Sequence, residues 1–258
     1  MDRTAKDKNL YIVLYLLLTL IICATVGALA VIGIRTADGH RDADETESET
    51  APLPDEYSNI TVVIDAGHGG EDGGTVGVNG VLEKDLNLSI ALALADALNS
   101  RGINTVLTRT EDILLYDRNS NYHGQKKAQD LAERRRIAEE CENAIFVSIH
   151  LNFFPEEKYS GLQVYYSEND PDSLKLAQEI QRLTAETLQP ENDRQCKASK
   201  DIYLLERLTC PAVLVECGFL SNAEECKQLC SPHYQKQLAY TLSEAIIKYI
   251  DARYGSIS

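Results

Sequence analysis

The sequence predicts a three-layer α/β domain built on a largely parallel sheet and preceded by one transmembrane helix. Short β-branched and apolar runs alternate along the chain with longer segments whose apolar residues recur at helical spacing. This alternation is typical of parallel strands joined by helices, which then cover both faces of the sheet. A long uncharged run close to the first residue predicts the transmembrane helix.

The uncharged run covers residues 10–34, which as a helix rising about 1.5 Å per residue are long enough to cross a hydrocarbon core of about 30 Å. Residues 1–9 carry the preceding basic charges, so we expect them in the cytoplasm and the chain beyond residue 35 outside it. Ala28-Leu29-Ala30 also offers a small-x-small cleavage site, so a signal peptide remains the alternative to an anchor. Either segment exports the rest of the chain.

Residues 35–59 are rich in Asp and Glu and contain little that a core could bury, which predicts a solvated, disordered linker. The functional domain is therefore expected over residues 60–254. The formal net charge of -15 argues against nucleic acid or an anionic lipid surface as a partner, because both would repel the chain. We expect contact with the membrane only through residues 10–34.

The first half of the domain contains two strand patterns and two helix patterns. Residues 60–65 (ITVVID) form a short β-branched run, and residues 86–100 (LNLSIALALADALNS) carry leucines and alanines at helical spacing before Arg101-Gly102 ends the pattern. Residues 103–108 (INTVLT) predict the next strand. Residues 126–141 (KKAQDLAERRRIAEEC) predict a charged amphipathic helix.

The second half continues the alternation. Residues 144–150 (AIFVSIH) are continuously apolar up to the histidine, which suits a buried central strand. Strands are also expected over residues 161–167 and 212–219, and helices near residues 172–188 and 233–250. Functional sites of such sheets lie at the carboxyl ends of the strands.

Three polar residues stand at such strand ends: His68 just past the first strand, His150 closing the third, and Glu216 within the run AVLVECGF. Glu83 opens the first helix. Two imidazoles and a carboxylate with one open position are a familiar ligand set for catalytic Zn²⁺, and a further carboxylate could deprotonate a water molecule. The glycines between residues 67 and 80 let the backbone turn sharply, so that His68 and Glu83 can reach one ion.

Simpler interpretations exist for each residue taken alone. A lone buried histidine is usually a hydrogen-bonded core residue, and a glutamate at a helix start offsets the helix dipole. Glu216 follows four apolar residues, where a carboxylate is costly to bury without a partner. A phosphate-binding loop does not fit, because the dinucleotide pattern meets Asp72 at its third glycine and the Walker pattern meets Thr75 at its lysine.

Six motifs carry a resemblance to a known family. VVIDAGHGGEDGG, LEKDLNL, LTR, SIHLN, GLQVYY and PAVLVECGFLSN occur in the order found in the zinc-dependent N-acetylmuramoyl-L-alanine amidases of the amidase-3 type, which are bacterial cell-wall hydrolases. The resemblance covers nearly all of residues 60–253. It implies a mixed six-stranded sheet between helices. Gly73, where many relatives have proline, and Cys217, where an aliphatic residue is common, depart from the family pattern.

The resemblance also implies the site and the reaction. His68, Glu83 and His150 match the family's ligands for one Zn²⁺, and Glu216 matches its catalytic carboxylate. The implied reaction is hydrolysis of the amide between N-acetylmuramic acid and L-alanine of the peptidoglycan stem peptide, in which Glu216 takes a proton from water and passes it to the leaving amine.

Further residues are expected to contact the substrate. Arg118 and Arg194 are candidates to pair with peptide carboxylates, and Asn152 is a candidate hydrogen-bond partner of the peptide. DILLYD and LNFFPEEKYSG most resemble the germination-specific members of spore formers, which have an N-terminal membrane segment and act on spore cortex in making muramic lactam. This likeness implies a membrane-anchored enzyme facing the cell wall or the forespore intermembrane space; an activating protein partner is left open.

Six cysteines lie outside the predicted membrane segment and would allow fifteen pairings if all were bridged. We expect them to be small buried thiols; a structural zinc site made of Cys210, Cys217, Cys226 and Cys230 is the alternative. Other functions also stay open at this point. They are a cysteine hydrolase using Cys217 with His150, a non-catalytic module that binds peptidoglycan or a protein, and a zinc carboxypeptidase.

Overall fold

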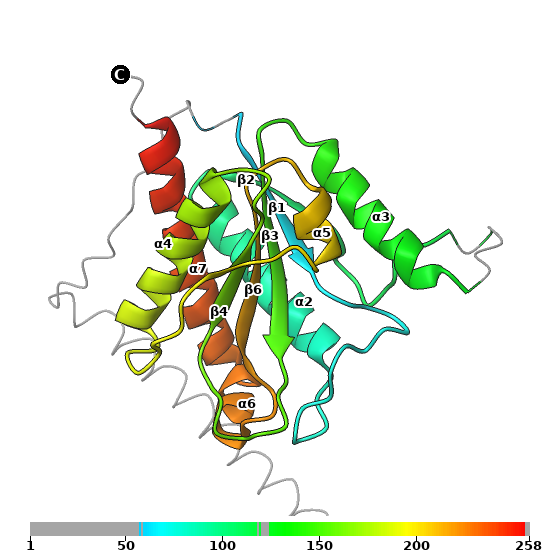
Figure 1. Ribbon diagram of the computed structural model, residues 1–258, viewed down its shortest axis with the longest axis vertical. Helices are drawn as coiled ribbons and strands as arrows, with labels where there is room; N and C mark the ends of the chain where they lie inside the picture. The colour runs from blue at the N-terminus through cyan, green and yellow to red at the C-terminus, as the bar shows by residue number, and fades with distance from the viewer. Residues whose placement is uncertain (1–56, 58, 118, 120–123, 256–258) are drawn as a thin grey trace, which may run out of the picture. The chain divides into compact units, whose positions relative to one another are not determined.

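The computed structural model describes residues 57, 59–117, 119 and 124–255 (Figure 1). Its six strands form one sheet, as expected. The strands are β1 (Thr61–Ala66), β2 (Asn104–Leu107), β3 (Ala144–Asn152), β4 (Gln163–Tyr166), β5 (Lys197–Ala198) and β6 (Ala212–Phe219). The helices are α2 (Glu83–Asn99), α3 (Lys126–Glu139), α4 (Asp172–Thr187), α5 (Tyr203–Arg207), α6 (Ala223–Leu229) and α7 (Pro232–Tyr254).

The strands follow the order β2-β1-β3-β6-β4-β5 across the sheet. The first four are mutually parallel, whereas β4 runs antiparallel to β6 and parallel to β5. The predicted mixed, mostly parallel sheet is therefore confirmed. Because β1, β3 and β6 are adjacent and parallel, their carboxyl ends meet at one edge of the sheet.

Helices cover both faces of the sheet: α2, α4 and α7 lie on one face, and α3 and α5 on the other (Figure 1). Successive side chains of a strand point to opposite faces. On β6, Val213 and Val215 belong to the larger core under α2, α4 and α7, while Leu214 belongs to the smaller core under α3 and α5. Glu216 follows in the same alternation, and it projects toward the α3 and α5 face.

The boundaries differ from the predicted ones in small ways. Helix α2 begins at Glu83, where the sequence placed a helix start, although the apolar periodicity becomes clear only from residue 86. The two-residue β5 and the five-residue α5 are too short for any periodicity and were not predicted. Tyr57, near the end of the predicted linker, is buried in the larger core.

The predicted membrane segment, residues 10–34, lies outside the described residues, and so does most of the linker. Within the described part of the chain, every helix is too short or too polar to cross a bilayer.

Candidate metal centre

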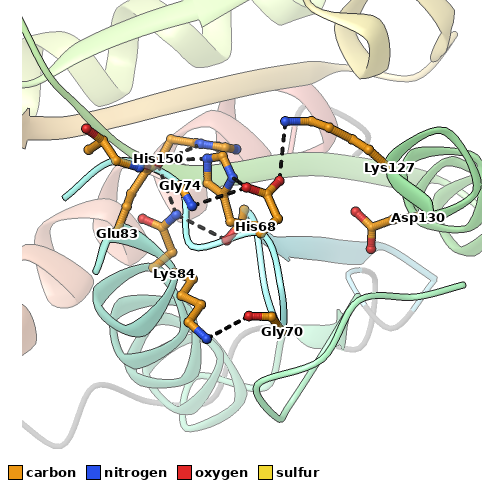
Figure 2. Close-up of polar contacts among 12 residues, drawn as sticks. His68, Gly70, Gly74, Glu83, Lys84, Lys127, Asp130 and His150 are labelled. Atoms are coloured by element: carbon orange, nitrogen blue, oxygen red, sulfur yellow. Dashed lines mark hydrogen bonds and ion pairs between the residues drawn. The ribbon is translucent and has the colours of Figure 1, made fainter. Parts of the chain in front are cut away.

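Three side chains from different elements converge at the carboxyl edge of the sheet. His68 follows β1, Glu83 opens α2, and His150 lies near the end of β3. Nε2 of His68 is 3.2 Å from Oε2 of Glu83, and Nδ1 of His150 is 3.0 Å from Oε1 of the same carboxylate. Figure 2 shows the three side chains pointing toward one another, and one ligand atom from each lies within 4.8 Å of the others. Among the described residues, this group is able to hold a metal ion.

Protein donors fix the Glu83 carboxylate in place. Oε2 accepts a hydrogen bond from the Thr75 amide at 2.9 Å, and Oε1 accepts bonds from the Leu151 amide at 3.1 Å and from Nδ2 of Asn87 at 3.2 Å. Burial acts to raise the pKa of Glu83, but the interactions with His150 and then His68 outweigh it, so the pKa lies well below its usual range. The carboxylate is therefore both ionised and oriented.

The cluster favours positive charge between its members. Burial acts to lower the pKa of His68, yet Glu83 and then Asp72 raise it above its usual value. The same field that holds a proton there would attract a metal cation, which competes with protons for imidazole nitrogens. Nδ1 of His68 is 3.0 Å from Oδ1 of Asp72, an outer carboxylate of the kind that orients metal-ligating histidines. The other oxygen of Asp72 is 3.3 Å from Nζ of Lys127 (Figure 2).

Two glycines allow the ligands to crowd together. A Cβ atom on Gly67 would lie 2.2 Å from Nε2 of His150. A Cβ atom on Gly74 would lie 2.5 Å from Oε2 of Glu83 and 2.8 Å from Cδ2 of His68. At Gly73 a Cβ atom would meet nothing closer than 3.7 Å, so the departure from proline there leaves the ligand packing intact. The close backbone approach expected of the glycine segment is present.

Two buried arginines donate hydrogen bonds to backbone carbonyls of the segment that carries His68. Arg134 on α3 donates from Nη1 to the Ala66 carbonyl and from Nη2 to the His68 carbonyl, both at 2.7 Å. Arg109 donates to the carbonyls of Ala66 and Gly67 at 2.9 and 3.0 Å. His68 itself has a positive φ of 62°, a conformation in which histidine is enriched although it is uncommon for residues other than glycine. The sequence did not identify either arginine as part of the site.

A carboxylate balances the charge of Arg134. Asp65, the buried fifth residue of β1, accepts a bond from Nη1 of Arg134 at 2.7 Å and bonds from Thr108 and Ser148 at 2.7 and 2.6 Å. Asp130 pairs with Nε of Arg134 at 2.8 Å. The signal that could have revealed Arg134 is the aspartate in the run VVID, because a carboxylate buried in an apolar strand requires a cationic partner.

We expect the pair to make stability depend on pH. Burial acts to raise the pKa of Asp65, but Arg134 and the hydrogen bonds from Ser148 and Thr108 lower it below its usual value. The ionised carboxylate therefore stabilises the fold above about pH 4, and this contribution is lost as the pH falls through the folded-state pKa. Urea unfolding of the parent chain and of Asp65→Asn should show a difference in unfolding free energy that is constant above about pH 5 and shrinks as the pH falls below about 4. A difference independent of pH would mean that Asp65 is not ionised in the fold.

Glu216 stands beside the three candidate ligands. It faces His150 across the β3–β6 register. Its Oε2 atom is buried and has no hydrogen-bond partner within the described part of the chain. Burial raises the pKa of Glu216 to about 7; His150 opposes this shift and Glu83 adds to it. An unpaired carboxylate oxygen next to a ligand cluster fits a site whose remaining partners are a cation and a water molecule, and a pKa near neutrality suits proton transfer.

Two of the three other residues predicted to contact the substrate line a groove near the candidate site. They are Asn152, the last residue of β3, and Arg194, before β5. Arg118 lies outside the described residues.

The cysteine alternatives do not fit the structure. Cys217 is fully buried in the larger core, on the face opposite to Glu216, and burial raises its thiol pKa well above the ordinary value. It is thus neither a thiolate nor within reach of the site. Cys210 packs against the smaller core and Cys226 lies in the larger one, so the proposed four-cysteine zinc site is divided between the two faces of the sheet. All six cysteines of the described residues are free thiols.

A three-layer α/β fold with two imidazoles, a fixed carboxylate and an unpaired carboxylate at its strand ends suits a hydrolase whose site could hold a metal ion. The family model for N-acetylmuramoyl-L-alanine amidase matches residues 62–248. The chain belongs to this family and is an enzyme of that class.

Curated relatives agree with this assignment. The chain is 36% identical over 192 residues to the germination-specific N-acetylmuramoyl-L-alanine amidase of Bacillus subtilis, covering 74% of this chain and 80% of the relative. It is 29% identical over 231 residues to the amidase LytC of the same organism, covering 87% of this chain but 43% of LytC.

Solved structures share the fold. The CwlD amidase of Clostridioides difficile, determined in complex with the GerS lipoprotein, has a TM-score of 0.71 and 40% identity; the match covers 74% of this chain and 98% of CwlD. AmiC2 of Nostoc punctiforme has a TM-score of 0.64 and 32% identity over 75% of this chain and 98% of AmiC2.

Proposed function

We propose that the enzyme binds one zinc ion through His68, Glu83 and His150 and hydrolyses the amide between N-acetylmuramic acid and L-alanine of the peptidoglycan stem peptide. The observation that carries this proposal is the convergence of the three side chains within 4.8 Å beside an unpaired carboxylate. A zinc ion at such a site supplies a Lewis acid for the amide carbonyl and lowers the pKa of water toward neutrality.

The protein's own groups divide the remaining work. Glu216, with a pKa of about 7, accepts a proton from the attacking water and returns it to the leaving amine of L-alanine. Glu83 lies between the two imidazoles, 3.2 Å from Nε2 of His68 and 3.0 Å from Nδ1 of His150, and would be the third ligand. Asp72 lies at ion-pair distance, 3.0 Å, from Nδ1 of His68 and would favour positive charge on that side of the ring. Asn152, two residues beyond His150, offers a side-chain amide to the substrate. Arg118 and Arg194 orient the peptide.

We further propose a role in spore cortex maturation, with muramic lactam formed after the peptide is removed. The name of the Bacillus subtilis relative supports a germination-linked role. In this proposal residues 10–34 anchor the chain and the catalytic domain lies outside the cytoplasmic membrane, in the cell wall or the forespore intermembrane space. A protein partner is part of the proposal, because CwlD was determined in complex with the GerS lipoprotein.

Metal content tests the ligand set. We expect the full chain, purified in detergent, to bind one zinc per molecule, and His150→Ala to weaken zinc binding by more than about 100-fold, because a ligand contributes at least as much as the outer groups that orient it. His233→Ala is the matched control, since His233 lies exposed on α7. Elemental analysis and chelator competition measure both. Parent-like zinc affinity in His150→Ala would remove His150 from the ligand set.

A further inference from the structure

A groove of about 340 Å³ opens near the carboxyl ends of β3 and β6, on the side of β4 and β5. Its lining includes Gln163, which faces Glu216 across the β4–β6 register, so the groove lies one strand away from the proposed catalytic carboxylate. Asn152 and Phe219 line the groove from the ends of β3 and β6. Two cations, Arg194 and Lys197, also line it.

We propose that this groove binds the peptide half of the substrate and that Arg194, assisted by Lys197, binds the free carboxylate of an acidic second residue of the stem peptide. The inference rests on the proposed amidase reaction at Glu216, and it assigns the direction in which the substrate lies. The contacts, charges and surroundings of the two cations support it.

The guanidinium of Arg194 is held in place and forms no ion pair with a carboxylate of the described residues, although burial raises the pKa of Glu225 and the charge of Arg194 acts to lower it. Nε donates to the Ser160 carbonyl at 2.7 Å, and Nη1 donates to Oε1 of Gln163 at 3.3 Å. The guanidinium lies over the rings of Phe219 and Tyr159, with its carbon 4.5 Å and 5.9 Å from their centres. Such stacking and bonding orient the planar fork that binds carboxylates with two parallel hydrogen bonds.

No carboxylate of the described residues forms an ion pair with Arg194 or Lys197. Other arginines of this acidic chain do form ion pairs with carboxylates, as Arg134, Arg135 and Arg182 show. Nη2 of Arg194 has no hydrogen-bond acceptor within the described part of the protein. Free donors on an oriented arginine in a groove are available to an anionic ligand.

Tyr165 lines the same groove as Arg194 and Lys197. Its hydroxyl pKa is raised chiefly by burial, then by Glu216, and is lowered by Arg194. The hydroxyl is therefore within electrostatic reach of both groups. Lys197 faces Tyr165 across the β4–β5 register and is exposed. Tyr165 and the two cations therefore line one groove, and Gln163, the register partner of Glu216, lines it with them.

The charges of the substrate match this direction. The muramic side of the scissile amide has no carboxylate, since its lactyl carboxyl group is consumed in the amide, whereas the peptide side carries free carboxylates. A second hollow, of about 190 Å³, is lined by His68 and His150, by apolar side chains of α3 and α5, and by the charged pairs Asp72–Lys127 and Asp130–Arg134. Both cations of that hollow are already paired with carboxylates, whereas no described carboxylate forms an ion pair with Arg194 or Lys197. The cationic groove is the side that suits the peptide.

Two synthetic disaccharide peptides that differ only at the second residue, a free carboxylate in one and a carboxamide in the other, test the assignment. We expect the parent enzyme to prefer the acid, mainly through a lower KM. Arg194→Gln should reduce that preference about 10-fold, since a charged hydrogen bond contributes about one factor of ten or more. Lys197→Gln should reduce it less. Lys158→Gln is the control, because Lys158 lies over the ring of Tyr159 without lining the groove.

Equal losses on both peptides, or a parent enzyme without preference, would overturn the assignment and leave Arg194 a structural role. Binding of the same peptides to the zinc-loaded Glu216→Gln protein, measured by calorimetry, separates this inference from the proposed function. If the parent enzyme hydrolyses neither peptide but the carboxylate preference appears in binding and is lost in Arg194→Gln, the amidase mechanism fails and the carboxylate site stands. If the parent enzyme hydrolyses the peptides but binds both equally well, the amidase mechanism stands and the carboxylate site is wrong.

Discussion

Glu216→Gln is expected to lower the rate of amide hydrolysis roughly 100- to 10,000-fold, the range that proton transfer by a placed side chain contributes. Glutamine has nearly the same shape but cannot accept the proton. Because Oε2 of Glu216 is buried without a partner, a neutral amide costs less to bury, so the variant should fold at least as stably as the parent and keep its zinc. Mass spectrometry of muropeptide digests measures the rate.

The same digests identify the bond that is cut. The parent enzyme should release stem peptides that begin with a free L-alanine amine, whereas a carboxypeptidase would release single amino acids. Glu224→Gln is the matched control, since Glu224 is an exposed carboxylate at the start of α6. Parent-like activity in zinc-loaded Glu216→Gln would show that another group transfers the proton.

Arg134→Met is expected to destabilise the fold by about 3 to 5 kcal/mol, because it leaves the Asp65 carboxylate buried without its cation. The side chain of Arg134 is 2% exposed and that of Asp65 is 1% exposed, so water cannot replace the lost partner. The variant also loses the bond to the His68 carbonyl, and zinc should bind more weakly. Denaturant unfolding and zinc competition measure the two effects.

The next residue of α3 supplies the control. Arg135 pairs with Glu139 at 2.7 Å on the exposed face of the helix. Exposed pairs of this kind contribute about 0 to 1 kcal/mol, so Arg135→Met should be close to neutral. Equal destabilisation by the two substitutions would show that helix α3, rather than the buried ion pair, carries the effect.

Local patterns in the sequence were enough to predict most of the fold. The apolar run before His150 predicts the central β3, and the spaced leucines and alanines after Glu83 predict α2. Because parallel strands end at one edge, the polar residues at their ends were expected together, and the structure brings His68, Glu83, His150 and Glu216 into one site. The family resemblance supplied the mixed sheet that periodicity could not.

Long-range partners were beyond such patterns. Arg134 contacts Asp65, which is 69 residues away in the sequence. The periodicity of a single helix or strand does not predict which residues pair over such a separation. The position of Arg109 was visible in the motif LTR, but its backbone carbonyl partners exist only after folding. The groove containing Arg194 likewise depends on β4 and β5, and β5 is only two residues long.

The left-handed backbone at His68 has a consequence for the order of events in folding. Holding such a residue costs on the order of 1 to 3 kcal/mol, and here the bonds that oppose this cost come from Arg134 and Arg109, which are protein groups. Small zinc domains, by contrast, fold only when the metal supplies the free energy. In this chain the histidine is positioned by protein groups, so we expect the polypeptide to reach its native shape first and to bind the proposed metal afterwards.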